Sequence, residues 1–283
     1  MNASDLGRPA TRFLPRDEGR IAYDVDGTGP LVVLVPGMAD LRSSFRLLAP
    51  ALIAAGFRVA TTDLRGHGDS DTTFTSYGDA ATADDISALI TELGGPAAVV
   101  GNSLAAGAAV IAAADHPELI SDLVLIGPFV RNPRSAPGMR TLMRLLVLPP
   151  WGAAVWKSYL PSLYAGTKPA DFDHYRDQLV TKLRQPGYGK AFAQTVAQTD
   201  HAVAEARLGE VTARTLVVMG EQDPDFADPT AEARWIGEAV NGRVVMVDEA
   251  GHYPQSQQPE LTATVVLEFL KEAHVDAESR TDH

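Results

Sequence analysis

The sequence predicts an α/β protein built on a mostly parallel sheet with helices on both faces. Short apolar runs alternate along the chain with longer segments of helical periodicity, and this alternation is typical of repeated βα units. Two of the runs, Leu31–Val35 and Leu123–Ile126, contain only aliphatic residues, as expected for strands that are buried on both faces. The chain has 283 residues, of which 45% are hydrophobic, so it is long enough to bury a sizeable core.

The strands are predicted from the apolar runs and the turn residues between them. Ile21–Val25 alternates apolar and polar residues, which predicts a half-exposed strand near an edge of the sheet. The turn residues 26–30 separate it from the first buried strand. The further predicted strands are Arg58–Thr62, Ala97–Val100, Leu123–Ile126, Thr215–Met219 and Arg243–Val247.

The helices are predicted between these strands. A helical pattern over 44–55 stops at Gly56, a residue that favours helix C-termini. Thr82 is expected to cap a helix that runs to about residue 93, and Asp228 is expected to cap a helix that begins with Pro229. The remaining predictions are a small-residue helix after Ser103, a last helix over 259–273 and a mobile polar tail over 275–283.

The βα alternation stops in the middle of the chain and resumes later. Residues 128–209 contain aromatic and leucine-rich helical patches broken by prolines, and no convincing strand. We therefore predict a core domain formed by residues 1–127 and 210–283, with residues 128–209 inserted as a helical cap.

Composition excludes several classes of function. The formal net charge of −12 argues against a nucleic-acid partner, because phosphate binding depends on clustered lysine and arginine. It argues more weakly against an anionic membrane surface. The chain has no cysteine, which removes disulfides, thiolate nucleophiles and cysteine-based metal sites. Neither a signal peptide nor an apolar run long enough to span a membrane is recognised, so we expect a cytoplasmic protein without a membrane partner.

The strongest local motif is Gly101-Asn102-Ser103-Leu104-Ala105, between a buried strand and a small-residue helix. A serine hydroxyl is a weak nucleophile, and a tight strand-to-helix turn presents it away from the sheet toward a base. Such a turn leaves no room for side chains two residues before and after the serine. Gly101 meets this demand, whereas Ala105 replaces the usual second glycine. The alternative role of Ser103 is an ordinary helix N-cap, which its position directly after a buried strand disfavours.

Together with two later loops, this motif resembles the α/β-hydrolase superfamily. In that family the nucleophile, the acid and the base follow one another in the order serine, aspartate or glutamate, histidine. Gly251-His252-Tyr253-Pro254 is similar to the base loop, and Gly220-Glu221-Gln222-Asp223-Pro224 is similar to the acid loop. The resemblance implies the α/β-hydrolase fold and a triad of Ser103, Asp223 and His252.

The same resemblance implies an oxyanion hole. Pro36-Gly37-Met38 is similar to the family's oxyanion loop, with Pro36 in place of the common histidine. The expected donors are the backbone N–H groups of Met38 and of Leu104, which starts the helix after the serine.

Each triad assignment has rivals. Asp225 and Asp228 compete with Asp223, which lies nearest the strand end, and Glu221 fits the pattern less well. His67 belongs to a turn that in the resembling family shapes a loop. The other histidines lack a post-strand loop setting, so surface or capping roles are expected for His116, His174, His201, His274 and His283.

The cap suggests an apolar substrate. In capped members of the family such an insertion roofs the active site, and its aromatic and leucine side chains predict a largely apolar pocket for a small or medium uncharged ester. For any one of these side chains, a place in the cap's own small core is the more common role. The predicted pocket residues are Phe129, Leu142, Leu145, Trp151, Trp156, Tyr159 and, from the base loop, Tyr253.

The bond that is cleaved stays open among three activities of the same fold. Ser103 argues against dehalogenases and epoxide hydrolases, which use an aspartate nucleophile. We expect a carboxylesterase or lactonase, with hydrolysis of a carbon–carbon bond as the alternative and a cofactor-free haloperoxidase-like hydrolase also open. A small-molecule receptor that retains the triad is the alternative from another class. An unperturbed His252 predicts that kcat/KM falls as the pH drops through about 6.5.

No cofactor or metal is expected. The histidines are scattered, the acidic residues lack the spacing of a calcium loop, and no glycine-rich phosphate loop follows a strand. The expected partner is therefore a small-molecule ester alone, and the oligomeric state is not predicted.

Overall fold

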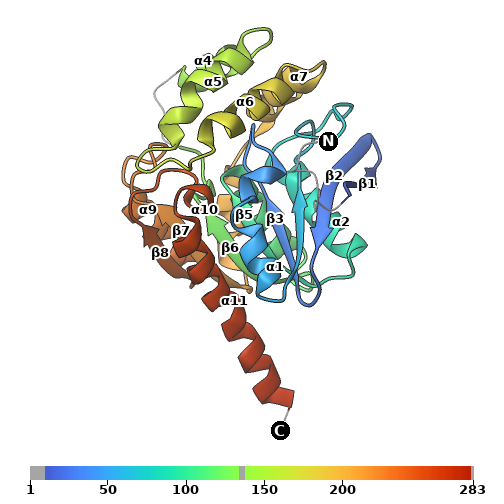
Figure 1. Cartoon of the computed structure of the whole chain (residues 1–283), viewed down its shortest axis with the longest axis vertical. Coiled ribbons are helices and arrows are strands. Elements are labelled where there is room, and N and C mark those ends of the chain that lie inside the picture. Colours follow the sequence, from blue (N-terminus) through green and yellow to red (C-terminus); the bar gives the residue numbers. More distant parts are fainter. Residues whose placement is uncertain (1–9, 134–137, 282–283) are drawn as a thin grey trace.

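The computed structural model describes residues 10–133 and 138–281, which form a single eight-stranded sheet covered by helices (Figure 1). The strand order is β1-β2-β4-β3-β5-β6-β7-β8. Strands β1 and β2 pair antiparallel, β2 pairs antiparallel with β4, and the other pairings are parallel. The strands are β1 Arg12–Arg16, β2 Gly19–Asp26, β3 Leu31–Val35, β4 Arg58–Thr62, β5 Ala97–Asn102, β6 Ile120–Ile126, β7 Arg214–Gly220 and β8 Arg243–Val247.

Helices bury both faces of this sheet. On one face the helices α2 (Asp79–Glu92), α3 (Leu104–Asp115) and α9 (Pro229–Ala239) contribute to one hydrophobic cluster. On the other face α1 (Ala49–Ala54) and α11 (Pro259–Thr281) contribute to a second cluster. The predicted α/β fold with a mostly parallel sheet is therefore confirmed, and it positions the loops at the carboxyl ends of β5, β7 and β8 on one side.

The segment predicted as a cap, residues 128–209, is helical in its described part. Its helices lie over the loops at one end of the sheet in Figure 1. Residues of α5, α6 and α7 form a third buried cluster, which also includes Ala39 and Tyr253 from the loops after β3 and β8. The elements of this segment are α4 Met139–Leu146, α5 Gly152–Leu163, α6 Phe172–Leu183, α7 Tyr188–Gln198, α8 Ala202–Arg207 and the 3-10 helix η3 Leu208–Glu210. Two further short elements belong to the core, η2 Arg42–Phe45 and α10 Pro254–Gln257.

Three local predictions differ from the structure. The edge strand β1 was not predicted, because Pro15 and two arginines interrupt its apolar pattern; proline is tolerated at a sheet edge, where no further strand pairs. Thr82 is not a cap, since α2 begins at Asp79 after Gly78. Helix α11 continues through Thr281 where a mobile tail was expected, because residues 271–281 contain no proline or glycine to end it.

One buried arginine, Arg42, links strand β2 to the loop after β4. Arg42 in η2 forms ion pairs with Asp24 at 2.8 Å, with Asp63 and with Asp69 at 2.9 Å. The Arg42 and Asp24 side chains are each 8% exposed and that of Asp63 is fully buried. The Asp24 side chain is thus buried, although β2 was predicted to be half exposed. A buried carboxylate without its partner is strongly destabilising, so this arginine is a structural requirement.

We expect Arg42→Met to lower the free energy of unfolding by about 3 kcal/mol or more, because it leaves the buried carboxylates of Asp24 and Asp63 unpaired. Chemical denaturation followed by circular dichroism measures this change. Arg20→Met is the matched control, because Arg20 also pairs with an aspartate but is 55% exposed; its expected loss is about 1 kcal/mol or less. Equal losses in the two variants would contradict the role given to Arg42.

Candidate active site

Ser103 occupies a strained turn between β5 and α3. Its backbone has φ 59° and ψ −124°, a conformation that costs a non-glycine residue on the order of 1–3 kcal/mol. Because both flanking elements are buried, and because the Ser103 N–H donates to the Ile126 carbonyl at 2.9 Å, the turn cannot relax locally. The serine is therefore presented at the carboxyl edge of the sheet, as the sequence predicts.

The packing around this turn explains its small residues. A Cβ atom on Gly101 would lie 2.6 Å from the Ala105 carbonyl oxygen, which excludes any larger residue. Ala105 itself is fully buried, so the turn has room for the methyl group that departs from the usual second glycine.

The loop after β3 lies directly against the serine. A Cβ atom on Gly37 would lie 2.8 Å from Ser103 Cβ and 3.4 Å from its Oγ, so only glycine permits this approach. Met38 follows Gly37, and Leu104 is the first residue of α3, whose N-terminus receives no capping side chain. Backbone N–H groups in these positions are suited to an oxyanion, and the assignment of Met38 and Leu104 stays a prediction.

A buried histidine holds the end of this loop. The Ala39 N–H donates to His67 Nε2 at 3.0 Å, and His67 Nδ1 lies 2.7 Å from the Arg65 carbonyl oxygen. Burial lowers the pKa of His67 to about 4, so the ring stays neutral, donates through Nδ1 and accepts through Nε2. His67 thus shapes the predicted oxyanion loop, where Ala39 has the positive φ of 54°.

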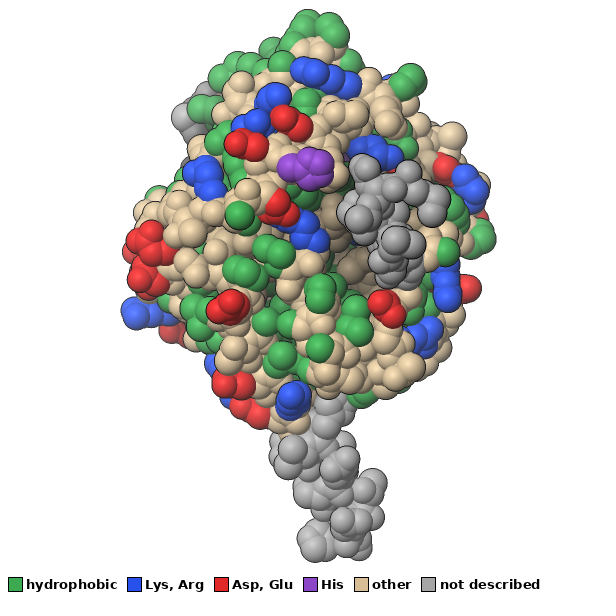
Figure 2. Space-filling model, in the orientation of Figure 1, with side chains coloured by type: hydrophobic (Ala, Val, Ile, Leu, Met, Phe, Trp, Pro, Cys, Tyr) green, Lys and Arg blue, Asp and Glu red, His purple; other side chains and the backbone are tan. Residues whose placement is uncertain are grey.

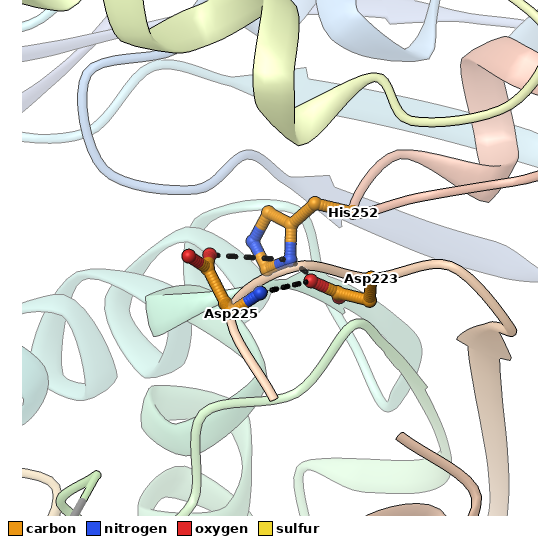
Figure 3. Close-up of side chains that lie close together, drawn as sticks. All are labelled: Asp223, Asp225 and His252. Atoms are coloured by element: carbon orange, nitrogen blue, oxygen red, sulfur yellow. Dashed lines mark hydrogen bonds and ion pairs between the residues drawn. The ribbon is translucent and has the colours of Figure 1, made fainter. Parts of the chain in front are cut away.

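The candidate base and acid meet in the loops after β8 and β7 (Figure 3). His252 Nδ1 lies 2.7 Å from Asp223 Oδ2 and 3.7 Å from Asp225 Oδ2. The Asp225 N–H in turn donates to Asp223 Oδ1 at 3.1 Å. Of the rival acids, Asp228 accepts the Ala231 N–H at 2.9 Å and caps α9, as predicted. The geometry favours Asp223 as the partner of His252.

Asn102 joins the serine turn to the histidine loop. Its Nδ2 donates to the Ile126 carbonyl at 3.0 Å and to the His252 carbonyl at 3.2 Å. The side chain is fully buried, so these bonds have no competition from water. The residue before the candidate nucleophile therefore fixes the backbone of the candidate base.

Three carboxylates determine the charge state of His252. Burial alone lowers the pKa of His252, but the adjacent Asp223, together with Asp225 and Asp40, outweighs burial and raises it to about 9. The ordinary value of about 6.5 used for the sequence prediction is thus too low for this site. Its error has a physical cause, because sequence spacing does not reveal how many carboxylates surround the ring.

Within the described residues, Asp223, Asp225 and His252 are the one cluster of side chains of the types that bind metal ions. Donor atoms of Asp223, Asp225 and His252 lie within 4.8 Å of one another in the described part of the chain. These atoms already bond within the site, since Asp223 binds His252 Nδ1 and the Asp225 N–H, while Asp225 Oδ1 accepts the Tyr159 hydroxyl at 2.7 Å. A metal would have to displace these bonds, so the arrangement fits an oriented imidazole better than a metal site.

The predicted pocket residues divide into two groups. The ring of Phe129 lies 5.8 Å from that of His252, Tyr159 binds Asp225, and Trp156 packs 5.7 Å from Tyr159. Tyr253 is buried and stacks 4.6 Å from Tyr164. The second group is about half exposed and shows no contact with the candidate triad in the described structure: Leu142, Leu145 and Trp151. For this second group a pocket role stays a prediction.

Two buried groups near the site were not foreseen. Asp40 is 1% exposed, accepts the hydroxyl of Tyr175 from α6, and leaves Oδ2 without a partner. His201 is buried rather than superficial, because its Nδ1 lies 2.6 Å from Asp79 Oδ1, and it stacks on Phe129 at 5.4 Å. Their partners are distant in sequence, and no local pattern marks either residue.

Comparison with known proteins agrees with this geometry. The alpha/beta hydrolase family matches residues 32–265, and the chain belongs to this family. It is 30% identical over 288 residues to the 2-(acetamidomethylene)succinate hydrolase of Mesorhizobium japonicum, covering 95% of this chain and 98% of that protein. It is 27% identical over 266 residues to a 2-hydroxy-6-oxononadienedioate/2-hydroxy-6-oxononatrienedioate hydrolase of Burkholderia vietnamiensis, covering 90% and 92%.

Solved structures share the fold. An esterase from Thermogutta terrifontis superposes with a TM-score of 0.76 at 24% identity, covering 94% of this chain and 99% of that one. The α/β-hydrolase fold and the hydrolase class predicted from the sequence are therefore confirmed, whereas the bond type is not resolved by these relatives.

We expect kcat/KM to begin falling with decreasing pH at a pH above the ordinary histidine pKa of about 6.5. This part of the pH profile is called the acid limb. The base must be neutral, so activity falls as the pH drops through its pKa, and the carboxylates raise that pKa. Asp225→Asn removes a negative charge 3.7 Å from Nδ1 and should move the limb to lower pH. The measurement is kcat/KM against pH on a p-nitrophenyl ester.

Asp228→Asn is the control, because this aspartate lies in the same loop but caps α9. Its acid limb should coincide with that of the wild type. A wild-type limb at or below about 6.5, or a limb that Asp225→Asn leaves in place, would contradict the electrostatic account of His252.

Proposed function

We propose that the protein is a serine hydrolase that cleaves small to medium, largely apolar carboxylic esters through Ser103, His252 and Asp223. One observation carries the proposal: a serine held at φ 59° after a buried strand, beside a loop whose histidine is hydrogen-bonded to a buried aspartate. An ordinary helix N-cap needs neither the strained backbone nor the neighbouring His–Asp pair.

The proposed reaction proceeds through an acyl-enzyme. Ser103 Oγ attacks the ester carbonyl carbon while His252 Nε2 accepts the hydroxyl proton, and the oxyanion takes hydrogen bonds from the N–H groups of Met38 and Leu104. The C–O bond then breaks and His252 returns the proton to the leaving alcohol. Water then attacks the acyl carbon as His252 Nε2 takes its proton, the bond between the acyl carbon and Ser103 Oγ breaks, and His252 returns the proton to Ser103 Oγ, which releases the acid and restores the serine hydroxyl. Asp223 holds the Nδ1 proton throughout and stabilises the imidazolium.

The surroundings of His252 support an uncharged, apolar substrate. Phe129 lies beside the imidazole and packs 5.0 Å from Phe226, and Trp156 and Tyr159 come from the cap. Three carboxylates surround the imidazole. A substrate with its own carboxylate next to the scissile bond would meet these charges unfavourably.

Hydrolysis of a carbon–carbon bond is the second candidate, and one of the two relatives named above supports it. The Burkholderia vietnamiensis relative, whose name describes an oxo-dienedioate hydrolase, is similar over 90% of this chain. The same serine, histidine and oxyanion donors serve both reactions. The two reactions differ in the leaving group. Cleavage of a carbon–carbon bond releases a carbanion that needs a proton, whereas cleavage of an ester releases an alcohol.

We expect the wild type to hydrolyse p-nitrophenyl butyrate and Ser103→Ala to lose at least about a thousandfold in kcat, because the nucleophile is absent. Stopped-time release of p-nitrophenolate measures the rate. A fluorophosphonate probe should add its mass to Ser103 in the wild type and nowhere in the variant, as followed by peptide mass spectrometry.

Three results separate the alternatives. Turnover of a 2-hydroxy-6-oxo-dienoate, with none on esters or lactones, would establish the carbon–carbon bond hydrolase instead. A folded wild type that binds such compounds but turns over none would favour a triad-bearing receptor. Fluorophosphonate labelling at a different serine would overturn the assignment of Ser103.

A further inference from the structure

The apolar side chains of helix α4 are exposed to solvent. An amphipathic helix of a globular protein normally buries its apolar stripe, yet every residue from Met139 to Leu145 is exposed. Its two arginines form hydrogen bonds with the backbone at the end of α7: Arg144 donates to the Ala197 carbonyl at 2.7 Å and Arg140 to the Thr199 carbonyl at 3.4 Å, while Val147 at the end of the helix is buried. The polar side thus attaches the helix, and its methionines and leucines remain in solvent.

The apolar surface continues beyond the helix. The Trp151 Nε1–H donates to the Leu145 carbonyl at 3.0 Å, which places its half-exposed ring next to the end of α4. Single exposed hydrophobics are ordinary, but a contiguous group marks an interaction site. We call this group the α4 face, formed by Met139, Leu142, Met143, Leu145, Leu148 and Trp151, each 38–54% exposed.

The charge of the chain is divided between cap and core. Residues 128–209 contain eleven lysines and arginines and five acidic residues, which gives a net charge of +6. The rest of the chain contains thirteen lysines and arginines and 31 acidic residues, which gives a net charge of −18. Residues 123–170, which include the α4 face, contain six lysines and arginines and no acidic residue. Within the described structure, neither Arg140 nor Arg144 lies within ion-pair distance of a carboxylate. At the upper end of the molecule in Figure 2, hydrophobic and basic side chains meet.

We propose that the α4 face docks on an anionic lipid bilayer surface. Exposed apolar side chains next to unpaired arginines, on a short amphipathic helix, suit the boundary between acyl chains and anionic headgroups. The net charge of the whole chain speaks against such a surface, but a bilayer meets only the cap, where the sign is reversed. Screening limits the reach of the acidic core to about 8–10 Å.

A second copy of the chain fits the α4 face less well. Two caps that pair face to face bring two net charges of +6 together. A cap placed against a core has the favourable charge but lacks an apolar counterpart, since the large hydrophobics exposed outside the cap, in the described residues, are the scattered Phe13, Leu47 and Leu261. The bilayer satisfies both the apolar and the cationic character.

The test is co-sedimentation of the full chain with vesicles. We expect binding to equal parts of phosphatidylcholine and phosphatidylglycerol, at least about tenfold weaker binding to phosphatidylcholine alone, and loss of most binding in about 1 M sodium chloride, where the Debye length is about 3 Å. Met139→Gln/Met143→Gln should weaken binding to the anionic vesicles roughly tenfold or more, because it removes apolar contact at nearly constant shape. Leu261→Gln, at a similarly exposed leucine of α11, is the matched control and should bind like the wild type.

Several outcomes decide the question. Thermal melts of the variants establish that each is folded, and Ser103→Ala should bind vesicles like the wild type, so failure of the proposed hydrolysis is distinguishable from failure of docking. Absence of binding to either vesicle overturns the proposal, as does equal weakening by the α4 pair and by Leu261→Gln. A wild-type dimer in analytical ultracentrifugation that the methionine pair dissociates shows that a second copy covers the α4 face, and also overturns it.

Discussion

The backbone of Ser103, held at φ 59°, is a strained conformation that the surrounding fold must maintain. Strain of about 1–3 kcal/mol persists only where neighbouring elements leave no alternative. Here the turn is anchored on the strand side by the parallel pairing of β5 with β6, and on the helix side by the fully buried first turns of α3. Asn102 then extends the same rigid unit to the His252 carbonyl. Hydroxyl, oxyanion loop and imidazole are thereby placed relative to one turn instead of relative to three independent loops.

The electrostatics of the site follow from how the imidazole is buried. A buried histidine beside no carboxylate loses its charge, as His67 does, whereas His252 is surrounded by Asp223, Asp225 and Asp40 and moves in the opposite direction. The cap takes part in this balance. Tyr159 from α5 donates a hydrogen bond to Asp225 and Tyr175 from α6 donates one to Asp40, so two hydroxyls from this segment bind carboxylates that raise the pKa of His252. The position of the cap and the charge state of the base are consequently linked.

The sequence predicts the sheet and the pair of His252 and Asp223 better than it predicts the surroundings of this pair, and the reason is the range of the interactions. Parallel strands buried on both faces are continuous apolar runs, so β3 and β6 are recognisable from a few residues, while Pro15 and charged neighbours conceal the edge strand β1. The serine motif is local, and its partners lie at ends of strands that the topology brings together. Asp40, by contrast, is buried because of Tyr175, 135 residues away, and His201 because of Asp79, 122 residues away. Local spacing carries no trace of either pair, which is why a surface or capping role was expected for His201 and why the sequence does not show the carboxylates around His252.

The net charge of the whole chain does not describe the charge of its separate surfaces. The sum of −12 combines a core of −18 with a cap of +6, and a large ligand interacts with one of these surfaces at a time, because salt screens the other. The argument against nucleic acid still holds for the cap, since several of its basic side chains pair with carboxylates, among them Arg131 with Glu232 and Lys182 with Asp69. Arg140 and Arg144 differ because they bind backbone carbonyls and form no ion pair in the described structure, beside exposed methionines and leucines. Apolar surface and positive charge without an ion-pair partner therefore coincide at α4, in the segment whose helices lie over the loops at one end of the sheet.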